Sequence, residues 1–203
     1  ADQRPLDRAA VRVTERLGHV DDAGAISLLA AHQHDLRITF APDVVASAEA
    51  AEPAALERRT DLRNLPLVTI DGSDARDFDD AVYARPDDAP DNPDGWQITV
   101  AIADVGHYVH PATPLDMEAR LRGNSTYFPD RVLPMLPEAL SNGLCSLRPG
   151  EDRACLAVHI WLDRHGQKTR HRFERGLMRS AARLTYEQVQ AAKDAGRTSA
   201  RCP

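Results

Sequence analysis

Apolar side chains recur with different periods along the chain, and the change of period predicts which segments form strands. Leu67-Val68-Thr69-Ile70 is a short β-branched run, typical of a buried strand. Alternation over residues 96–102 and 156–162 predicts two longer strands, and Asp163–Gly166 predicts a turn into a returning basic strand. Strands and helices mix without a regular βαβ order. This favours an α+β fold with a mixed or antiparallel sheet and flanking helices.

Capping and breaking residues predict where helices begin and end. Asp21-Asp22 provides an N-cap for a helix over residues 23–32, Pro42 suits the start of a second helix, and Pro53 suits a third. Three more helices are predicted from typical end residues, and they begin at Thr113-Pro114, at Pro137 and at Thr185, the last with Gln188 in the capping-box position. Residues 1–20 fit a strand and a helical stripe equally well.

Composition places the chain among soluble globular proteins. Of its 203 residues, 42% are hydrophobic and 28% are charged. No apolar run reaches the roughly 18 residues of a membrane-spanning helix, so no membrane partner is expected. The three cysteines form no C-x-x-C pair, so we expect neither a zinc site nor a disulfide framework, and a cytoplasmic location is expected. The chain lacks a hydrophobic leader and an initial methionine, and its ends look like cuts through a longer protein.

The charge of the chain is distributed unevenly. The net charge is −6, but residues 1–100 hold 10 basic against 20 acidic groups, whereas residues 101–203 hold 15 against 11. A basic run in the second half is opposed only by Glu174, and it comprises Arg164, Lys168, Arg170, Arg172, Arg175, Arg179 and Arg183. This run is either a strip that faces phosphates or a solvated face, and charge alone does not decide between them.

Five aspartates crowd ten residues after the first apolar strand, at Asp71, Asp74, Asp77, Asp79 and Asp80. Two carboxylates about 5 Å apart repel each other by about 3 kcal/mol at an effective dielectric of roughly 20, so such a cluster is solvated or holds cations. Mg²⁺ takes oxygen ligands and commonly pairs with substrate phosphates, which points to phosphoryl chemistry. An EF-hand loop is excluded, because its sixth and twelfth positions hold Arg76 and Val82. A merely solvated loop leaves the apolar Ile70 and Phe78 unexplained.

The stretch Thr69–Ala81 resembles the signature loop of the ribonuclease II/ribonuclease R family, in the RNB catalytic domain. Further motifs match this family in the same order, at residues 102–109, 122–129, 132–137, 140–147 and 182–186. Residues 11–60 are similar to the segment that joins the second cold-shock domain to the catalytic domain in ribonuclease R. The resemblance divides the chain into residues 1–60, the end of a cold-shock domain with a helical linker, and residues 61–203, the N-terminal portion of a truncated RNB domain.

The resemblance implies a hydrolytic 3′→5′ exoribonuclease that acts on the 3′ end of single-stranded RNA and releases nucleoside 5′-monophosphates. It implies two-metal-ion catalysis with Mg²⁺, or Mn²⁺, held by Asp71, Asp77, Asp79 and Asp80. Among these, the position of Asp79 is the one most critical for turnover. The resemblance further implies that Tyr127 stacks on the terminal base, that Tyr186 favours ribose over deoxyribose, and that Arg183 contacts RNA.

The chain also departs from the family, and two alternatives stay open. The family's later catalytic arginine and second clamp aromatic have no counterpart, so the chain alone is expected to be weakly active or inactive. The alternatives are a non-catalytic RNA-binding or regulatory fragment and an unrelated metal-dependent phosphohydrolase that acts on small phosphomonoesters. His107 and His110 suggest zinc at first sight, but three residues apart on a strand they face opposite sides, so they are interpreted as structural.

Overall fold

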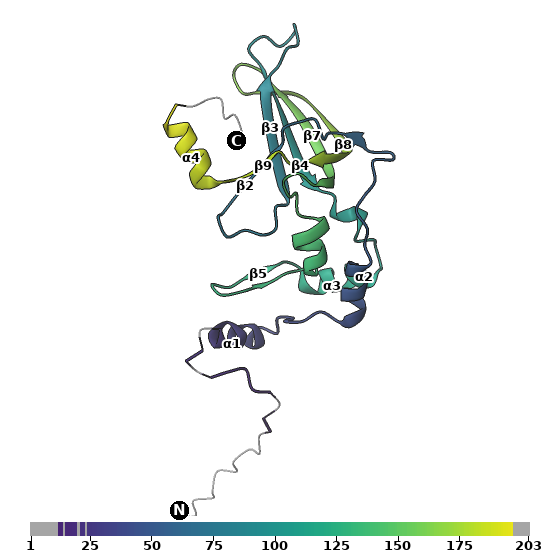
Figure 1. Cartoon of the computed structure of the whole chain (residues 1–203), viewed down its shortest axis with the longest axis vertical. Helices are drawn as coiled ribbons and strands as arrows, with labels where there is room; N and C mark the ends of the chain where they lie inside the picture. Colours follow the sequence, from purple (N-terminus) through teal and green to yellow (C-terminus); the bar gives the residue numbers. More distant parts are fainter. Residues whose placement is uncertain (1–11, 14, 20, 23, 197–203) are drawn as a thin grey trace, which may run out of the picture.

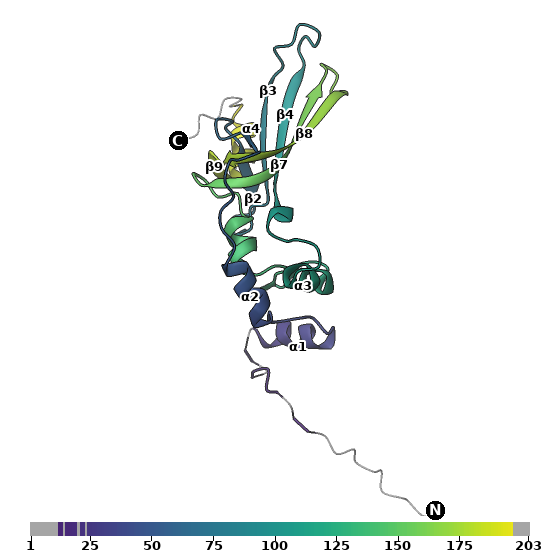
Figure 2. The same cartoon turned by 90° about the vertical axis from the view of Figure 1, so that its right-hand side faces the viewer.

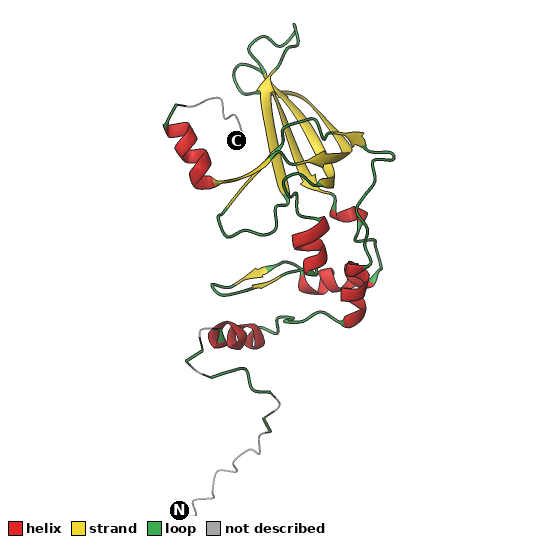
Figure 3. Ribbon diagram, in the orientation of Figure 1, coloured by secondary structure: helices red, strands yellow, loops and turns green. Residues whose placement is uncertain are grey.

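The computed structural model describes residues 12–13, 15–19, 21–22 and 24–196, so the element predicted over residues 1–20 lies largely outside the described residues. Within this part of the chain, seven strands form one sheet in the order β1-β8-β7-β4-β3-β2-β9 (Figure 1, Figure 3). Their bounds are β1 Thr60–Asp61, β2 Val68–Asp71, β3 Asp80–Pro86, β4 Trp96–Ala103, β7 Asp152–Leu162, β8 Lys168–Arg179 and β9 Ala182–Thr185.

The sheet is mixed, which confirms the predicted α+β class. Neighbouring strands run antiparallel from β8 through β7, β4 and β3 to β2. At the two edges the pairing is parallel, because β1 joins β8 and β9 joins β2. The register sets Asp71 opposite Thr185 and Asp80 opposite Ile102. Both ends of the aspartate-rich loop therefore lie at the same end of the sheet.

The helices lie at one end and one side of this sheet. Figure 1 shows α1, α2 and α3 gathered below the sheet and α4 beside β9, while Figure 2 shows the β3–β4 and β7–β8 connections extending at the opposite end. The bounds are α1 Ala25–Gln33, α2 Pro42–Glu49, the 3₁₀ helix η1 Val105–His107, α3 Pro114–Arg122, the π-helical segment η2 Ala139–Leu144 and α4 Tyr186–Asp194. A short hairpin consists of β5, Thr126–Tyr127, and β6, Val132–Leu133. No helix in the described part of the chain combines the length and the hydropathy of a membrane span.

The predicted starts of α2, α3 and α4 are confirmed by their capping residues. α2 begins at Pro42, and the Thr113 side chain accepts a hydrogen bond from the N–H of Asp116 at the start of α3. Thr185 and Gln188 form the predicted capping box of α4, in which each side chain bonds to the backbone of the other residue. In these three places the local capping chemistry determines where the helix begins.

Other helix predictions are only partly right: helices exist near residues 23–32 and after Pro137 with different ends or type, whereas the helix after Pro53 is wrong. α1 begins at Ala25 with Gly24 as N-cap, because the Asp22 carboxylate accepts a hydrogen bond from the N–H of His19 (2.7 Å) instead of capping the helix. No helix follows Pro53, since Glu57 has a φ of +35°, which an α-helix does not allow, and the chain passes into β1. The segment predicted as a helix from Pro137 is π-helical over residues 139–144.

The placement of His107 and His110 on a strand is also wrong. β4 ends at Ala103, and His107 closes the 3₁₀ helix η1 while His110 follows in the loop before α3. The strand ends here because Asp104 is drawn into the interior, where its carboxylate pairs with Arg59 at 2.8 Å. Both histidines therefore belong to the connection between the sheet and α3.

The two faces of the sheet are packed differently. Small side chains on one face, among them Ala81, Ala101 and Ala157, are fully buried in a core that includes residues of α2, α3 and η2. On the opposite face the larger apolar side chains of β3, β4 and β7 all remain at least partly exposed, namely Val82, Ile98, Val100, Ile102, Leu156, Val158 and Ile160. The alternation that predicted these strands thus reflects one packed face and one open apolar face.

The segment predicted as a linker shares this core. Val44 and Ala48 of α2 belong to the same buried cluster as Leu115 and Ala119 of α3. The packing is therefore continuous across residue 60, and the predicted domain boundary at that residue stays a prediction.

Candidate active site

The aspartate-rich loop connects β2 to β3 and is anchored by Phe78. Asp71 is the last residue of β2 and Asp80 the first of β3, so residues 72–79 form the loop itself, hereafter the acidic loop. Phe78 is only 8% exposed, whereas Asp77 is half-buried and Asp79 is exposed. Burial of one aromatic ring thus holds the two flanking carboxylates at the surface, which explains why an apolar residue interrupts the aspartates.

Ser146 fixes the backbone around this anchor. Its Oγ accepts a hydrogen bond from the N–H of Phe78 (3.1 Å) and donates one to the carbonyl of Arg76 (3.2 Å). The N–H of Leu147 donates to the carbonyl of Phe78 (2.6 Å). Ser146 is fully buried, and sequence reasoning missed its role. The available signal was a serine among apolar residues within the motif at residues 140–147.

Arg183 holds the first half of the acidic loop from β9. Its Nη2 donates to the carbonyls of Gly72 (2.9 Å), Ser73 (2.8 Å) and Ala75 (3.4 Å). The guanidinium carbon lies 4.8 Å from the centre of the Phe78 ring, within the range of a cation–π contact. The structure therefore places this predicted RNA contact against the backbone of the acidic loop, a role that sequence reasoning did not identify.

The carboxylates of this region carry an excess of negative charge. Burial, together with the nearby charges of Asp80 and Asp79, raises the pKa of Asp71, and Arg183 only partly offsets this effect. The pKa of Asp79 is also raised, because neighbouring atoms partly desolvate its carboxylate, although the residue as a whole is exposed, and because the charges of Asp80 and Asp77 repel it. Oδ2 of Asp71 is buried and makes no hydrogen bond of regular geometry in the described part of the chain, although the nearby Thr69 hydroxyl, also unpaired, partly lowers the pKa of Asp71. Such an acceptor is costly to leave unpaired, and a cation would satisfy it.

The four predicted metal ligands share this end of the sheet but do not form a closed cage. Among the described residues, no three His, Cys, Asp or Glu side chains lie close enough together to hold a metal ion as they stand. Mutual repulsion of carboxylates favours such an open arrangement. The donor chemistry and the unpaired Asp71 Oδ2 nevertheless suit a hard divalent cation.

Two exposed tyrosines border the acidic loop. Tyr127 lies on β5, its side chain is 64% exposed, and its hydroxyl donates to Oδ2 of Asp77 at 2.9 Å. This hydrogen bond raises the pKa of Tyr127. Tyr186 is 61% exposed and begins α4 directly after Thr185, the residue paired with Asp71 across β2 and β9. Figure 1 shows both the β5 hairpin and α4 on the same side of the molecule as the loop between β2 and β3.

The basic run does not gather at the acidic loop. It follows β8, which is separated from β2 by β7, β4 and β3, and only Arg183 of the run contacts the loop. Three of its members are engaged in ion pairs, Arg172 with Glu174 (3.3 Å), Arg175 with Asp104 (3.5 Å) and Arg179 with Asp152 (2.8 Å). The choice between a phosphate-facing strip and a solvated face stays open.

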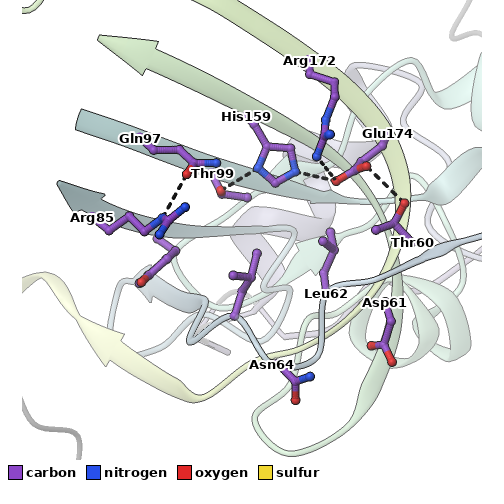
Figure 4. A pocket seen from close by; sticks show the side chains of 12 residues that line it. Thr60, Asp61, Leu62, Asn64, Arg85, Gln97, Thr99, His159, Arg172 and Glu174 are labelled. Atoms are coloured by element: carbon purple, nitrogen blue, oxygen red, sulfur yellow. Dashed lines mark hydrogen bonds and ion pairs between the residues drawn. The ribbon is translucent and has the colours of Figure 1, made fainter. Parts of the chain in front are cut away.

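A cavity of about 400 Å³ lies elsewhere on the packed face, between the chain around β1 and strands β3, β4, β7 and β8. Figure 4 shows His159 between Thr99 and Glu174, at 2.9 Å from the Thr99 hydroxyl and 2.6 Å from the Glu174 carboxylate. Thr60 donates a further bond to Glu174 (3.1 Å). These groups satisfy one another, so we interpret them as a structural network. None of the predicted site residues lines this cavity.

Comparison with models of protein families matches residues 59–202 to the RNB domain. The chain belongs to the RNB domain family. Ribonuclease R of Escherichia coli (strain K12) is 46% identical over 193 residues, which cover 92% of this chain and 23% of that protein. Ribonuclease R of Acidithiobacillus ferrooxidans is 57% identical over 133 residues, which cover 66% of this chain and 29% of that protein. This RNB chain thus spans about a quarter of the length of these curated relatives.

Solved structures give the same result. Mycoplasma genitalium RNase R in complex with ribose-methylated single-stranded RNA has a TM-score of 0.83 and 30% identity, and the match covers 92% of the RNB chain and 29% of that chain. Yeast Ssd1, described as a pseudonuclease, has a TM-score of 0.64 and 21% identity over 73% of this chain and 18% of that chain, a likeness that shows the fold alone. The fold by itself therefore does not decide between an active and an inactive site, and the residues of the acidic loop must carry that argument.

Proposed function

We propose that the RNB protein represented by this chain is a hydrolytic 3′→5′ exoribonuclease, and that the acidic loop with Asp71 and Asp80 is its metal-binding centre. The observation that carries this proposal is the placement of these carboxylates at one end of the sheet, in the loop that connects β2 to β3, with Asp71 Oδ2 buried. Identity of 46% and 57% to proteins named ribonuclease R supports the same activity.

Mg²⁺, or Mn²⁺, fits this centre by its chemistry. Asp71, Asp77, Asp79 and Asp80 offer only carboxylate oxygens, the ligands that these hard cations prefer. The raised pKa values of Asp71 and Asp79, which result from burial and crowding, are the values expected where a divalent cation normally offsets charge. A bound Mg²⁺ pair would supply a nucleophilic water and stabilise charge on the scissile phosphate. Asp79 is the ligand whose loss we expect to lower turnover most.

The two exposed tyrosines are proposed to hold the 3′ end of single-stranded RNA. Aromatic rings stack on any base, which suits an enzyme without sequence preference. The Tyr127 ring is exposed while its hydroxyl is tied to Asp77, a geometry suited to a terminal nucleotide beside the metal centre. Tyr186 is proposed to favour ribose. A direct RNA contact from Arg183 must compete with its hydrogen bonds to the loop carbonyls.

The 203-residue chain by itself is expected to be weakly active or inactive, and the full-length protein is expected in the cytoplasm. The chain spans about a quarter of the ribonuclease R relatives, and the open apolar face of its sheet leaves large side chains such as Ile102 and Leu156 exposed. Site geometry depends on well-packed supporting residues, so a sheet with one open face is a poor scaffold for catalysis.

The proposed activity is tested with full-length protein, Mg²⁺ and an oligoribonucleotide labelled at either end. We expect 3′-labelled RNA to release labelled nucleoside 5′-monophosphate at once, whereas 5′-labelled RNA shortens stepwise. A deoxyribonucleotide of the same sequence serves as the control for ribose preference. Release of internal fragments, or hydrolysis of a small phosphomonoester with no action on RNA, would contradict the proposal and favour an unrelated phosphohydrolase.

A further inference from the structure

The register of β9 against β2 places Arg183 close to the acidic loop. β9 runs parallel to β2, with Arg183 opposite Thr69 and Thr185 opposite Asp71. In parallel strands, paired residues lie on the same face of the sheet, so Arg183 shares its face with Asp71. From this position its long side chain extends past the end of the strand and reaches the loop that leaves β2, although Arg183 and Ser73 are 110 residues apart in the chain.

The Arg183 guanidinium supplies hydrogen-bond donors to backbone carbonyls of the acidic loop. Within the acidic loop the carbonyls of Gly72, Ser73 and Ala75 turn toward one point, and Arg183 Nη2 bonds to all three at 2.8 to 3.4 Å. Nη2 carries two N–H groups, so at least one of them is shared between two carbonyls, and what a lysine ammonium lacks is the flat guanidinium face beside the Phe78 ring. The same plane lies near the ring of Phe78, the buried anchor of the loop. One side chain thus joins the first half of the loop to its anchor.

The position of the Arg183 guanidinium is unfavourable for one of its own donors. Nε of Arg183 is buried and finds no acceptor in the described chain. If the guanidinium were positioned so that all of its own donors were paired, Nε would have an acceptor. Its position is instead determined by the loop carbonyls and the Phe78 ring. A positive charge in this position also opposes the mutual repulsion of the aspartates around it.

We propose that Arg183 is a positioning residue that gives the acidic loop the shape in which its carboxylates bind metal, and that it acts through the loop backbone rather than through RNA. The metal part of this proposal rests on the proposed function, whereas the loop part rests on the contacts of Arg183 alone. Loss of a residue that orients metal ligands typically lowers metal affinity by about 10- to 100-fold.

The test compares R183Q and R183K with wild type in two measurements, hydrogen exchange of the loop amides and Mn²⁺ affinity by calorimetry. In R183Q we expect the amides of Ala75 and Phe78 to exchange at least about tenfold faster, and the Mn²⁺ dissociation constant to rise about 10- to 100-fold. Protection in β4 and β7 should stay unchanged, which separates positioning from general unfolding. R183K keeps the charge and a nitrogen with three N–H groups but loses the planar group beside Phe78, so the amide of Phe78 should exchange faster than in wild type.

R170Q is the matched control. Arg170 is also a strand arginine over an aromatic ring, 4.1 Å from the centre of Trp161, but it lies on β8, away from the acidic loop. R170Q should leave loop exchange and Mn²⁺ affinity at wild-type values. RNA affinity measured in EDTA provides the result that would overturn the proposal. If R183Q exchanges its loop amides as wild type does but loses RNA affinity, and R183K restores that affinity, then Arg183 is an RNA contact. A wild-type chain that binds no Mn²⁺ would contradict the proposed metal centre, while exchange would still decide the role of Arg183 in the loop.

Discussion

The hydroxyl of Tyr127 donates a hydrogen bond of 2.9 Å to Oδ2 of Asp77, 50 residues earlier in the chain. This bond ties the β5–β6 hairpin to the acidic loop while the tyrosine ring stays exposed. A predicted RNA contact and a predicted metal ligand are therefore joined directly. The hydroxyl and the ring of Tyr127 have separable tasks, and substitutions can remove one without the other.

Tyr127→Ala removes both the ring and the hydroxyl, whereas Tyr127→Phe removes only the hydroxyl. Base stacking on an aromatic ring contributes about 1–3 kcal/mol, so we expect Y127A to weaken binding of single-stranded RNA about 5- to 150-fold in EDTA. Y127F should stay within about twofold of wild type, because it keeps the stacking surface. Fluorescence anisotropy with full-length protein measures both. Equal losses in the two variants would instead assign RNA affinity to the hydroxyl.

Asp71→Asn should stabilise the metal-free chain at neutral pH. Burial, with the charges of Asp80 and Asp79, raises the pKa of Asp71 above its model-peptide value. A carboxyl whose pKa is higher in the folded than in the unfolded chain contributes stability below the unfolded pKa and loses it as the pH rises through the folded pKa. We expect D71N to raise the free energy of unfolding by about 1 kcal/mol at pH 7 in EDTA, because it removes a partly buried negative charge that Asp80 and Asp79 repel.

The pH dependence provides the control for this substitution. As the pH falls below the pKa of an aspartate in the unfolded chain, about 3.9, Asp71 is protonated in both states and the advantage of D71N should disappear. Urea denaturation in EDTA across this pH range measures the difference. A D71N advantage that is constant with pH would show that the substitution acts through packing and not through charge.

Ser146→Ala should destabilise the chain by about 1–3 kcal/mol, because it leaves the buried N–H of Phe78 without its acceptor. Ser141→Ala is the matched control, since Ser141 Oγ makes only a long bond of 3.4 Å to the carbonyl of Pro137. We expect S141A to lie within about 0.5 kcal/mol of wild type in urea denaturation. Similar values for the two variants would argue against Ser146 as the support of the acidic loop.

Arg59→Met should be the most destabilising of these substitutions. Arg59 and Asp104 form an ion pair of 2.8 Å whose side chains are 9% and 6% exposed. Removal of Arg59 leaves a buried carboxylate with only the longer contact to Arg175 (3.5 Å), so a loss of about 3 kcal/mol is expected. Arg63→Gln, which removes the more exposed pairs of Arg63 with Asp61 and Asp152, should cost clearly less. A loss for R59M no larger than that for R63Q would show that the pair is solvated.

The sequence predicted those features that depend on neighbouring residues. Alternation located β4 and β7, and the capping box at Thr185 located α4, because both signals are local. The helix expected after Pro53 is wrong because the positive φ of Glu57 ends any helical path there, and Arg59 two residues later is drawn to the distant Asp104. Propensity contains no information about such a partner.

The candidate site shows the same division. The loop after a buried strand was predictable, since a β-branched run directly precedes the aspartates. The contacts of Ser146, Tyr127 and Arg183 with the loop join residues 50 to 111 positions apart, and no spacing rule reports them. The open apolar face could not be predicted either, because alternation shows that the two faces of a strand differ but not whether other elements cover each face.

Metal-dependent hydrolysis of RNA is the activity proposed for the acidic loop. Its most direct test is the rate of nucleoside 5′-monophosphate release by full-length protein carrying Asp79→Asn, compared with Asp74→Asn, an aspartate of the same loop outside the proposed ligand set. We expect D79N to lose release by at least about 100-fold while it still binds RNA, and D74N to stay near wild type. Retained release in D79N, or an equal loss in D74N, would contradict it.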